Sequence, residues 1–480
     1  MSVLAIDVGT SSIRASVARP DGTVERERHV PFLPSTPFPG LVEFDAAEMA
    51  VVAVALARQV LGDGGPVEAV GITNQRASTV VWDPVSGDPV GPALGWQDLR
   101  TVGECLALQA DGIRLAPNQS ATKVAALLDQ ADPDRRRGLL VGTVDSWLAW
   151  VLTEGRAHVT DLTNASVTGL LLLDGSGWDR SVLDALRIPV ESLPSIVDSA
   201  SVVGRAVALP GAPPIAGIVG DQQASLVGQC CVLPGLAKIT FGTGGMLDMW
   251  LGDERPAFAT RGAGGTFPIV TNRRAGRVSW GLEGIMLAAG TNVEWLRDDL
   301  GIIADAASSD AVAAECDSAE GVVFVPALLG LGTPQWDHGA RGTLLGVTRG
   351  TTRAHLVRAV LEGVAQRGAD LVEAAETDSG STIGSLRIDG GMSANATFVQ
   401  ALADATRRPI ELSPVLEATT RGAAFFAALG IGLLRDEDEI AGLWRPRGVV
   451  EPKGELDRGR WADAVRRAGG WHDELSAIDF

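Results

Sequence analysis

The sequence has few of the residues that mark redox, secreted or metal-binding proteins. Its 480 residues include four cysteines, and no two of them have CxxC spacing; they are Cys105, Cys230, Cys231 and Cys316. The adjacent pair, Cys230 and Cys231, is poorly suited to a metal site or an ordinary disulfide. We therefore expect a reducing, cytoplasmic compartment.

Long apolar runs and basic clusters are also missing. No apolar stretch approaches the roughly 18 residues of a membrane span, and Met1–Ala5 enters an apolar segment with no basic leader. Acidic residues outnumber basic ones by 59 to 40, giving a net charge of -19, and no basic cluster with interleaved aromatics offsets it. We therefore expect a soluble protein with neither a nucleic-acid nor a membrane partner.

The chain is long and apolar enough for two cores. Hydrophobic residues make up 46% of it, and single cores stop growing beyond roughly 250 to 300 residues. Strand-like segments at Ala69–Ile72 and Gly138–Val141 alternate with amphipathic segments at Ala46–Val60 and Ala354–Glu373. This alternation is typical of an α/β protein, and we expect a domain boundary in the Gly-rich region around Asp221–Gly235.

Two glycine turns of similar design lie far apart in the chain. Asp7–Ser12 stands between two short apolar strands, and Gly242–Gly245 stands between two others. Two such hairpins suggest two related domains facing each other, although chance also produces echoes this short.

These turns carry groups that phosphoryl transfer needs, namely backbone donors for phosphates and a carboxylate for a divalent cation. In the first turn, N–H groups and hydroxyls suit a phosphate and Asp7 suits magnesium held largely through water. Arg14, beyond the turn, is either a phosphate contact or a solvated residue. The second turn has fewer side chains, so a phosphate can approach its backbone closely. An ordinary hairpin turn remains the alternative for the first.

A third glycine element, Asp389–Asn395, follows the apolar segment Leu386–Ile388. It has the pattern of strand, turn and helix start, which suits close approach of a nucleotide. No GxxxxGK followed by Ser or Thr occurs, which excludes a Walker-type loop.

Polar residues that suit a polyol follow three apolar segments. Asp221 comes directly after one of them and suits a base that takes or orients a hydroxyl proton, with Gln222 as a hydroxyl ligand. A helix N-cap is the alternative for Asp221. Thr73–Arg76 and Trp96–Asp98 offer hydrogen-bonding groups beside an indole face, which suits a polyol, although loop capping around a core tryptophan fits equally well.

Taken together, these segments resemble the FGGY family of carbohydrate kinases, and most closely its glycerol kinase branch. The resemblance extends nearly end to end and rests on matches, in order, at Asp7–Arg14, Gly71–Arg76, Trp96–Thr101, Val144–Leu148, Thr160–Ser166, Gly220–Gln223, Phe241–Gly244, Leu282–Gly284, Gly330–Asp337, Ala340–Gly342 and Asp389–Asn395.

This resemblance implies an α/β, two-domain, actin-like and ribonuclease H-like ATPase fold with an interdomain cleft. The implied domains are residues 1–230 on the substrate side, with the catalytic base at their end, and residues 231–480 on the nucleotide side. ATP and Mg²⁺ are the implied cofactors, and the implied reaction phosphorylates a hydroxyl of a small polyol or sugar. Related kinases often form dimers or tetramers, so we expect a homo-oligomer.

The resemblance also implies the site residues. Asp221 is the expected base and Asp7 assists magnesium. The expected ATP contacts are Thr10, Ser11, Ser12, Arg14, Thr243, Gly290, Glu294, Gly391 and Asn395. The expected substrate contacts are Arg76, Ala77, Trp96, Asn118, Asp221, Gln222 and Met246.

The sequence departs from the glycerol kinase pattern around the substrate. Ala77, Asn118 and Met246 stand where Glu, Tyr and Phe are usual, the chain has no tyrosine, and Glu294 stands where Gln is frequent. Loss of the glutamate removes a charge-assisted hydrogen bond of roughly 1.5 to 3 kcal/mol, which weakens glycerol binding about ten-fold or more. The hypothesis is a polyol or ketose of four or five carbons, with glycerol secondary.

Alternatives remain open within the resemblance and outside it. A glycerol kinase with an altered pocket competes with an erythritol-, xylulose- or ribulose-type kinase. A sugar sensor or scaffold of the same fold without turnover is the other class. Such a protein would be expected to lose the base or a phosphate turn, whereas Asp221 and both hairpins are present.

Overall fold

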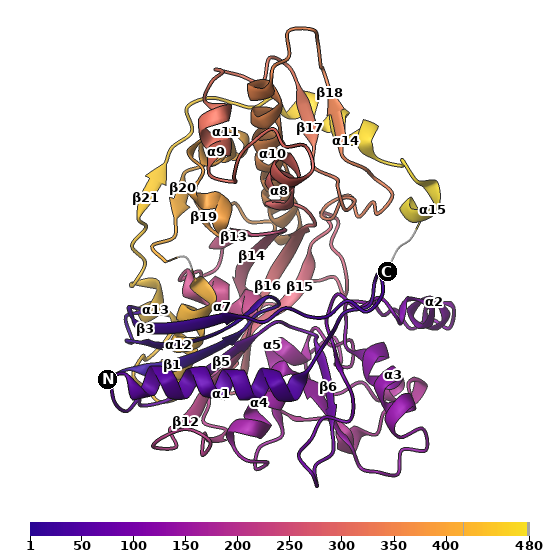
Figure 1. Ribbon diagram of the computed structural model, residues 1–480, viewed down its shortest axis with the longest axis vertical. Coiled ribbons are helices and arrows are strands. Elements are labelled where there is room, and N and C mark those ends of the chain that lie inside the picture. The colour runs from indigo at the N-terminus through magenta and orange to yellow at the C-terminus, as the bar shows by residue number, and fades with distance from the viewer. Residues whose placement is uncertain (416, 478–480) are drawn as a thin grey trace.

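Two mixed sheets, one in each half of the chain, organise the fold (Figure 1). The computed structural model describes residues 1–415 and 417–477. The N-terminal lobe lies below the C-terminal lobe in the view of Figure 1, and helices pack against both sheets. The expectation of a two-domain α/β fold is confirmed.

The N-terminal sheet combines an antiparallel meander with parallel strands. Its strand order is β11-β12-β5-β1-β2-β3. β1 and β2 form the hairpin expected from the first glycine turn, and β5 and β12 continue the sheet parallel to β1. The strands are β1 Val3–Val8, β2 Ser12–Ala18, β3 Val24–Pro31, β5 Val70–Asn74, β11 Gly204–Arg205 and β12 Pro214–Gly220.

The C-terminal sheet repeats this arrangement, with the order β15-β16-β14-β13-β19-β20-β21. The hairpin β13–β14 is extended by antiparallel β16 and β15, and β19 and β20 run parallel to β13. The two glycine turns therefore occupy equivalent places in two related sheets. The strands are β13 Ala237–Phe241, β14 Gly245–Gly252, β15 Phe267–Arg274, β16 Arg277–Met286, β19 Leu386–Asp389, β20 Ile410–Leu412 and β21 Gly448–Val450.

The remaining elements flank these sheets. Three smaller sheets are formed by β4 Glu43–Phe44, β6 Thr79–Trp82, β7 Ala93–Leu94 and β8 Leu140–Thr143, by β9 Val159–Asp161 with β10 Ser195–Val197, and by β17 Val323–Val325 with β18 Thr343–Leu345. The helices are α1 Ala46–Gly62, α2 Val102–Ala110, α3 Ala121–Ala131, α4 Val144–Leu152, α5 Leu162–Ala165, α6 Arg180–Ala185, η1 Val190–Ser192, α7 Asp221–Gly228, α8 Thr291–Asp298, α9 Ser308–Ala313, α10 Arg353–Ser379, η2 Gly391–Ala394, α11 Ala396–Thr406, α12 Ala418–Gly430, α13 Glu437–Ala441, α14 Arg458–Ala468 and α15 Asp473–Ser476.

Side-chain size decides which face of the N-terminal sheet receives which helix. Successive residues of a strand point to opposite faces. In β1 the larger Leu4 and Ile6 pack with α1, whereas Ala5 packs with alanines of α12. Asp7 shares the face of Ala5, which directs its side chain toward α12.

Helix α12 comes from late in the chain but packs on the N-terminal sheet and on α7 (Figure 1). Glycines make this contact so close that backbones touch. A Cβ at Gly422 would lie 1.8 Å from the carbonyl oxygen of Ala224, and one at Gly71 would lie 2.2 Å from that of Ala423. Only glycine therefore fits at these positions without movement of the backbone.

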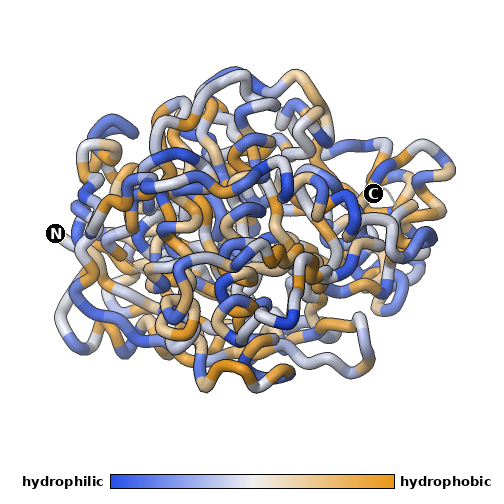
Figure 2. The backbone as a smooth tube through the Cα atoms, turned by 90° about the horizontal axis from the view of Figure 1, so that it is seen from above, coloured by the Kyte–Doolittle hydropathy of each residue, from blue (hydrophilic) through white to orange (hydrophobic). Residues whose placement is uncertain are grey.

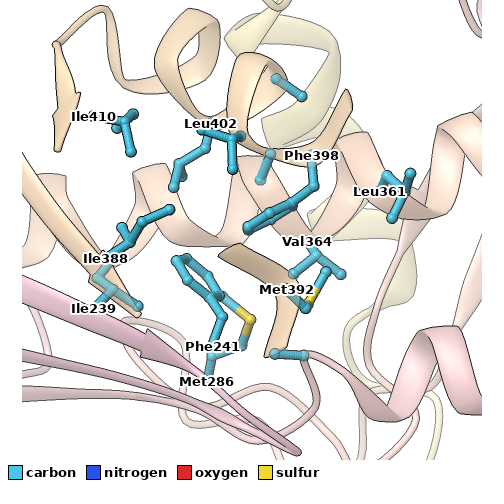
Figure 3. Packing of buried hydrophobic residues seen from close by; sticks show 14 of the residues in the cluster. Ile239, Phe241, Met286, Leu361, Val364, Ile388, Met392, Phe398, Leu402 and Ile410 are labelled. Carbon is cyan, nitrogen blue, oxygen red and sulfur yellow. The ribbon is translucent and has the colours of Figure 1, made fainter. Parts of the chain in front are cut away.

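Aromatic packing anchors the C-terminal glycine turn. Phe241 is fully buried among apolar side chains of β19, α10 and α11 (Figure 3). Its ring meets that of Phe398 edge-on, with centroids 4.8 Å apart, a geometry worth about 0.5–1.5 kcal/mol beyond area burial. The residue that precedes the second glycine turn is therefore held rigidly by its packing.

Hydrophobic and hydrophilic segments are interspersed along the coloured tube in Figure 2. Among the residues that the structure describes, none of the helices has the length and apolarity needed to cross a membrane.

Close packing between α7 and α12 is testable by adding one methyl group. We expect Gly422→Ala to lower the free energy of unfolding by about 1–3 kcal/mol, the range for overpacked sites, in urea denaturation. Gly62→Ala is the matched control, because nothing lies within 4 Å of a Cβ there; its change should stay below about 0.5 kcal/mol. Equally small effects in both variants would contradict the backbone contact.

Candidate active site

Asp7 and Asp221 extend from the same edge of the N-terminal sheet. Strand register places both Asp7 and Val219 beside Thr73, and Asp221 follows Val219 by two residues. Burial raises the pKa of Asp7 to about 7, and the charge of Asp221 acts in the same direction. The two carboxyl groups are therefore close enough to sense each other.

The chemistry of this edge fits a hydrated magnesium ion. Asp7 is 9% exposed, and its Oδ2 accepts a hydrogen bond from Thr419 Oγ1 at 2.8 Å. Carboxylate oxygens are the ligands that Mg²⁺ takes, usually one or two together with several waters. The described residues contain no group of three or more His, Cys, Asp or Glu able to hold a metal, so an ion here would keep most of its water.

Asp221 is the first residue of α7, and Gly220 occupies the N-cap position. The N-cap alternative for Asp221 is therefore wrong, although its Oδ1 does accept the N–H of Gln222 at 2.8 Å. The Gly220 N–H donates to Thr163 Oγ1 at 2.8 Å, and that hydroxyl donates to the buried Asp161 at 2.8 Å. This network fixes the backbone just before Asp221. The side chain of Asp221 remains 24% exposed.

Arg76 joins Asp221 to the C-terminal lobe. Its Nε lies 3.3 Å from Asp221 Oδ1, and its Nη2 lies 2.6 Å from Glu283 Oε2. Burial raises the pKa of Asp221, and the positive charge of Arg76 lowers it in opposition. Nη1 of Arg76 is buried without a hydrogen-bond partner in the described part of the chain, so its two N–H donors are unused there.

Three charged residues form a row across the C-terminal sheet, here called the charge row. Strand register places Lys238 beside Asp248, and Asp248 beside Glu283. The Lys238 ammonium lies 2.7 Å from Asp248 Oδ2, and neither side chain is exposed. Arg76 contacts one end of the row and Gln222 contacts the other. The row therefore ties together the residues expected to bind substrate.

No local pattern in the sequence predicted a role for the charge row. Glu283 appeared only within the Leu282–Gly284 segment of the family resemblance, and Lys238 and Asp248 lay within segments interpreted as apolar strands. A signal was available, because these two opposite charges stand inside apolar strands at positions that the hairpin places opposite each other.

The expected substrate residues come from both lobes. Ala77 follows Arg76 with a φ of 60°, in the left-handed region, and its carbonyl accepts Ser120 Oγ at 2.9 Å. This bond brings the loop that contains exposed Asn118 near Ala77. Met246, half-buried, shares a strand face with Asp248.

Trp96 is held from two sides. Its Nε1 donates to Thr10 Oγ1 at 3.1 Å, and its carbonyl accepts the Lys123 ammonium at 2.9 Å. The indole is therefore at the protein surface beside the first glycine turn, 37% exposed. The core-tryptophan alternative is wrong. Thr10, expected to contact ATP, also contacts a residue expected to bind substrate.

The second and third glycine turns meet at the end of the C-terminal sheet. The carbonyl of Thr243 accepts the N–H of Ala289, and that of Gly242 accepts the N–H of Gly290 at the start of α8. A Cβ at Gly390, whose φ is 83°, would lie 2.4 Å from the Phe241 carbonyl oxygen. Thr243, Gly290 and Gly391 are thus brought together around exposed backbone.

The other expected ATP residues are more dispersed. Arg14 pairs with Glu417 at 2.9 Å and so does not lie free in solvent. Asn395 caps α11 by accepting the Phe398 N–H. Glu294 is exposed on α8, and Ser11 and Ser12 lie in and after the first turn.

Family models for the two halves of one group of kinases match this chain. The N-terminal domain of the FGGY family of carbohydrate kinases matches residues 2–228, and the C-terminal domain matches residues 237–431. The chain belongs to the FGGY family of carbohydrate kinases. The resemblance derived from the sequence is confirmed.

Similar proteins match this chain over most or all of their length. Glycerol kinases of Trichlorobacter lovleyi and Rhodopirellula baltica are 43% and 39% identical to the chain, covering 98% and 100% of it and 99% and 93% of their own length. The crystal structure of Plasmodium falciparum glycerol kinase with ADP has a TM-score of 0.89 at 28% identity, covering 100% of this chain and 99% of its own. A xylulose kinase from Rhodospirillum rubrum shares the fold, with a TM-score of 0.82 at 23% identity and 99% coverage of both chains. The protein is an ATP-dependent kinase of a carbohydrate or polyol.

The raised pKa of Asp7 makes the stability of the ligand-free kinase depend on pH. The pKa of this carboxyl group rises from 3.8 in the unfolded chain to about 7 in the native state. The shift therefore stabilises the native state fully below pH 3.8, and this stabilisation is lost as the pH rises to 7. Between about pH 5 and pH 8, we expect the unfolding free energy of the wild type to fall by about 2–3 kcal/mol more than that of Asp7→Asn. Urea denaturation without Mg²⁺ measures the difference.

Asp63→Asn is the control for removal of a carboxyl group at an exposed position. Parallel curves for the wild type and Asp7→Asn would show that Asp7 has an ordinary pKa.

Proposed function

We propose that this kinase transfers the γ-phosphate of ATP to a hydroxyl of a four- or five-carbon polyol or ketose, with Asp221 as the base and glycerol as a poorer substrate. The observation that carries the proposal is the position of Asp221, which is partly exposed at the sheet edge between Arg76 of its own lobe and the charge row of the other. The division of the chain into residues 1–230 and 231–480 is part of the same proposal.

Asp221 acts on the attacking hydroxyl in this scheme. Its carboxylate accepts the hydroxyl proton as the oxygen attacks the γ-phosphorus in line. The raised pKa of Asp221 suits this role, because a base is most effective when its pKa approaches the working pH. Arg76 holds Asp221 in place and offers its unpaired Nη1 to a second hydroxyl.

Backbone groups of the C-terminal lobe would receive the nucleotide phosphates. Gly242 and Gly391 support this, because their Cα positions are open and a phosphate can approach the N–H groups. Asp7 would hold magnesium largely through water. The ion supplies charge that screens the phosphate oxygens. Exclusion of water by contact between the lobes would keep water from acting as the acceptor.

Pocket composition decides the choice of substrate in this proposal. The full-length relatives named glycerol kinase favour glycerol. Ala77, Asn118 and Met246 favour a longer molecule, because smaller or more flexible side chains replace a charge and two aromatic rings of the usual pattern. We give the longer substrate precedence because Ala77, buried beside Arg76, has no polar side-chain atom that could accept a hydrogen bond from a glycerol hydroxyl.

Two further expectations remain proposals. A homo-oligomer follows from the family resemblance. A cytoplasmic, reducing location agrees with the four unpaired cysteines of the described residues.

The assigned base is tested by Asp221→Asn. We expect kcat to fall about 100- to 10,000-fold, the usual contribution of a general base, while the Kd for ATP stays within about two-fold. ADP release and calorimetry measure the two effects, and Asp253→Asn serves as an exposed control. Undiminished turnover in Asp221→Asn would rule out the role. A wild type that binds nucleotide but forms no ADP with any polyol would favour the sensor alternative.

The pocket is tested by restoring the usual acid. In Ala77→Glu, the new carboxylate should raise kcat/KM for glycerol about ten-fold, whereas the neutral Ala77→Gln should gain less. A panel of glycerol, erythritol, xylulose and ribulose, assayed by ADP release, compares the variants with the wild type. A wild-type kcat/KM for glycerol far above every other compound would contradict the preference for four or five carbons.

A further inference from the structure

Lys238 donates two hydrogen bonds and forms one ion pair inside the protein. An ammonium group has three N–H donors and no acceptor. Its nitrogen lies 2.7 Å from Asp248 Oδ2, 3.0 Å from Thr240 Oγ1 and 3.1 Å from Gln222 Oε1. Lys238 is fully buried, so its ammonium group is out of reach of a substrate and of bulk water.

These contacts decide which way round the Gln222 amide lies. Only the amide oxygen can face an ammonium group, because the amide NH₂ is itself a donor. The NH₂ of Gln222 therefore points away from Lys238. In the described part of the chain it has no protein acceptor, and Gln222 is only half-buried.

The β13–β14 hairpin sets the orientation of the Gln222 amide in the ligand-free protein. Lys238 and Asp248 are direct cross-strand partners in β13 and β14. A buried lysine needs a counter-charge to stay ionised, and Asp248 supplies it from a rigid sheet. Arg76 holds the neighbouring Asp221 in the same way from the N-terminal lobe. Each of the two adjacent residues, Asp221 and Gln222, is thus held by its own cation.

We propose that Lys238, anchored by Asp248, is a positioning residue that presents the Gln222 NH₂ to the substrate and so selects a substrate group that accepts a hydrogen bond. The inference rests on the proposed function, in which Gln222 faces the polyol. A hydroxyl or a ketose carbonyl satisfies this position, because both accept. A protonated amine does not, because it only donates.

Amino analogues of glycerol test the polarity of this position. The probes are glycerol, 2-amino-1,3-propanediol and 3-amino-1,2-propanediol, whose amines are protonated at neutral pH. We expect the wild type to use at least one aminodiol with kcat/KM about 100-fold below that for glycerol, since a donor-only group there leaves the Gln222 NH₂ unpaired.

Gln222→Glu should reverse that discrimination. One carboxylate oxygen still meets Lys238, and the other now faces the substrate as an acceptor. The ratio of kcat/KM for the disfavoured aminodiol to that for glycerol should rise at least about 30-fold, with the KM for ATP within about two-fold of wild type.

A second variant removes the anchor itself. Lys238→Met/Asp248→Leu replaces the buried pair by apolar groups of similar size and frees the amide to turn over. We expect the discrimination against the aminodiol to fall about five-fold or more, again with an unchanged KM for ATP. Arg408→Met/Glu376→Leu is the control, because this ion pair lies beside β20, two strands away from β13 in the C-terminal sheet; it should keep the wild-type ratio.

The outcomes separate this inference from the proposed function. Absence of ADP formation by the wild type with every polyol would overturn the proposed function and the inference with it. Two outcomes would overturn the inference alone, provided that the wild type turns over polyols normally. In the first, the wild type uses both aminodiols as readily as glycerol. In the second, Gln222→Glu leaves the ratio of kcat/KM for the aminodiol to that for glycerol unchanged. If Lys238→Met/Asp248→Leu does not fold, Gln222→Glu still decides, because its Lys238–Asp248 pair is intact.

Discussion

Buried charge at the contact between the lobes constrains everything around it. The carboxylates of Asp221, Asp248 and Glu283 are largely hidden from water, and Arg76 and Lys238 pair with them. Loss of one partner from such a pair leaves an uncompensated charge that costs about 3–5 kcal/mol. Of these ion pairs, Arg76 with Glu283 joins the two lobes. Separation of the lobes here therefore exchanges this pair for contacts with water or with a bound molecule.

The repeated sheet design explains why the chemistry collects at one edge. In both lobes the hairpin and its parallel neighbour end together, so a turn and a strand end lie side by side. The N-terminal edge carries Asp7 and Asp221, and the C-terminal edge carries Asp389 together with open backbone at Gly242 and Gly391.

Local patterns revealed the framework but not the long-range pairs. Both hairpins, the α/β alternation and the placement of Asp221 after a strand follow from short stretches of sequence. Element ends differed by a few residues: β1 continues to Val8, so Asp7 lies within the strand, and α10 continues to Ser379. Arg76 and Glu283 are 207 residues apart, and no local pattern links them. Whether an exposed indole such as Trp96 belongs to a core or to a surface likewise depends on how distant segments pack.

The return of α12 to the first lobe has a consequence for synthesis. One face of the N-terminal sheet, lined by Ala5, Gly71 and Ala216, is covered by residues 418–430. While the ribosome is still making the middle of the protein, that face has no cover and stays open to water. The first half of the polypeptide therefore completes this face of its sheet only after residues 418–430 have left the ribosome.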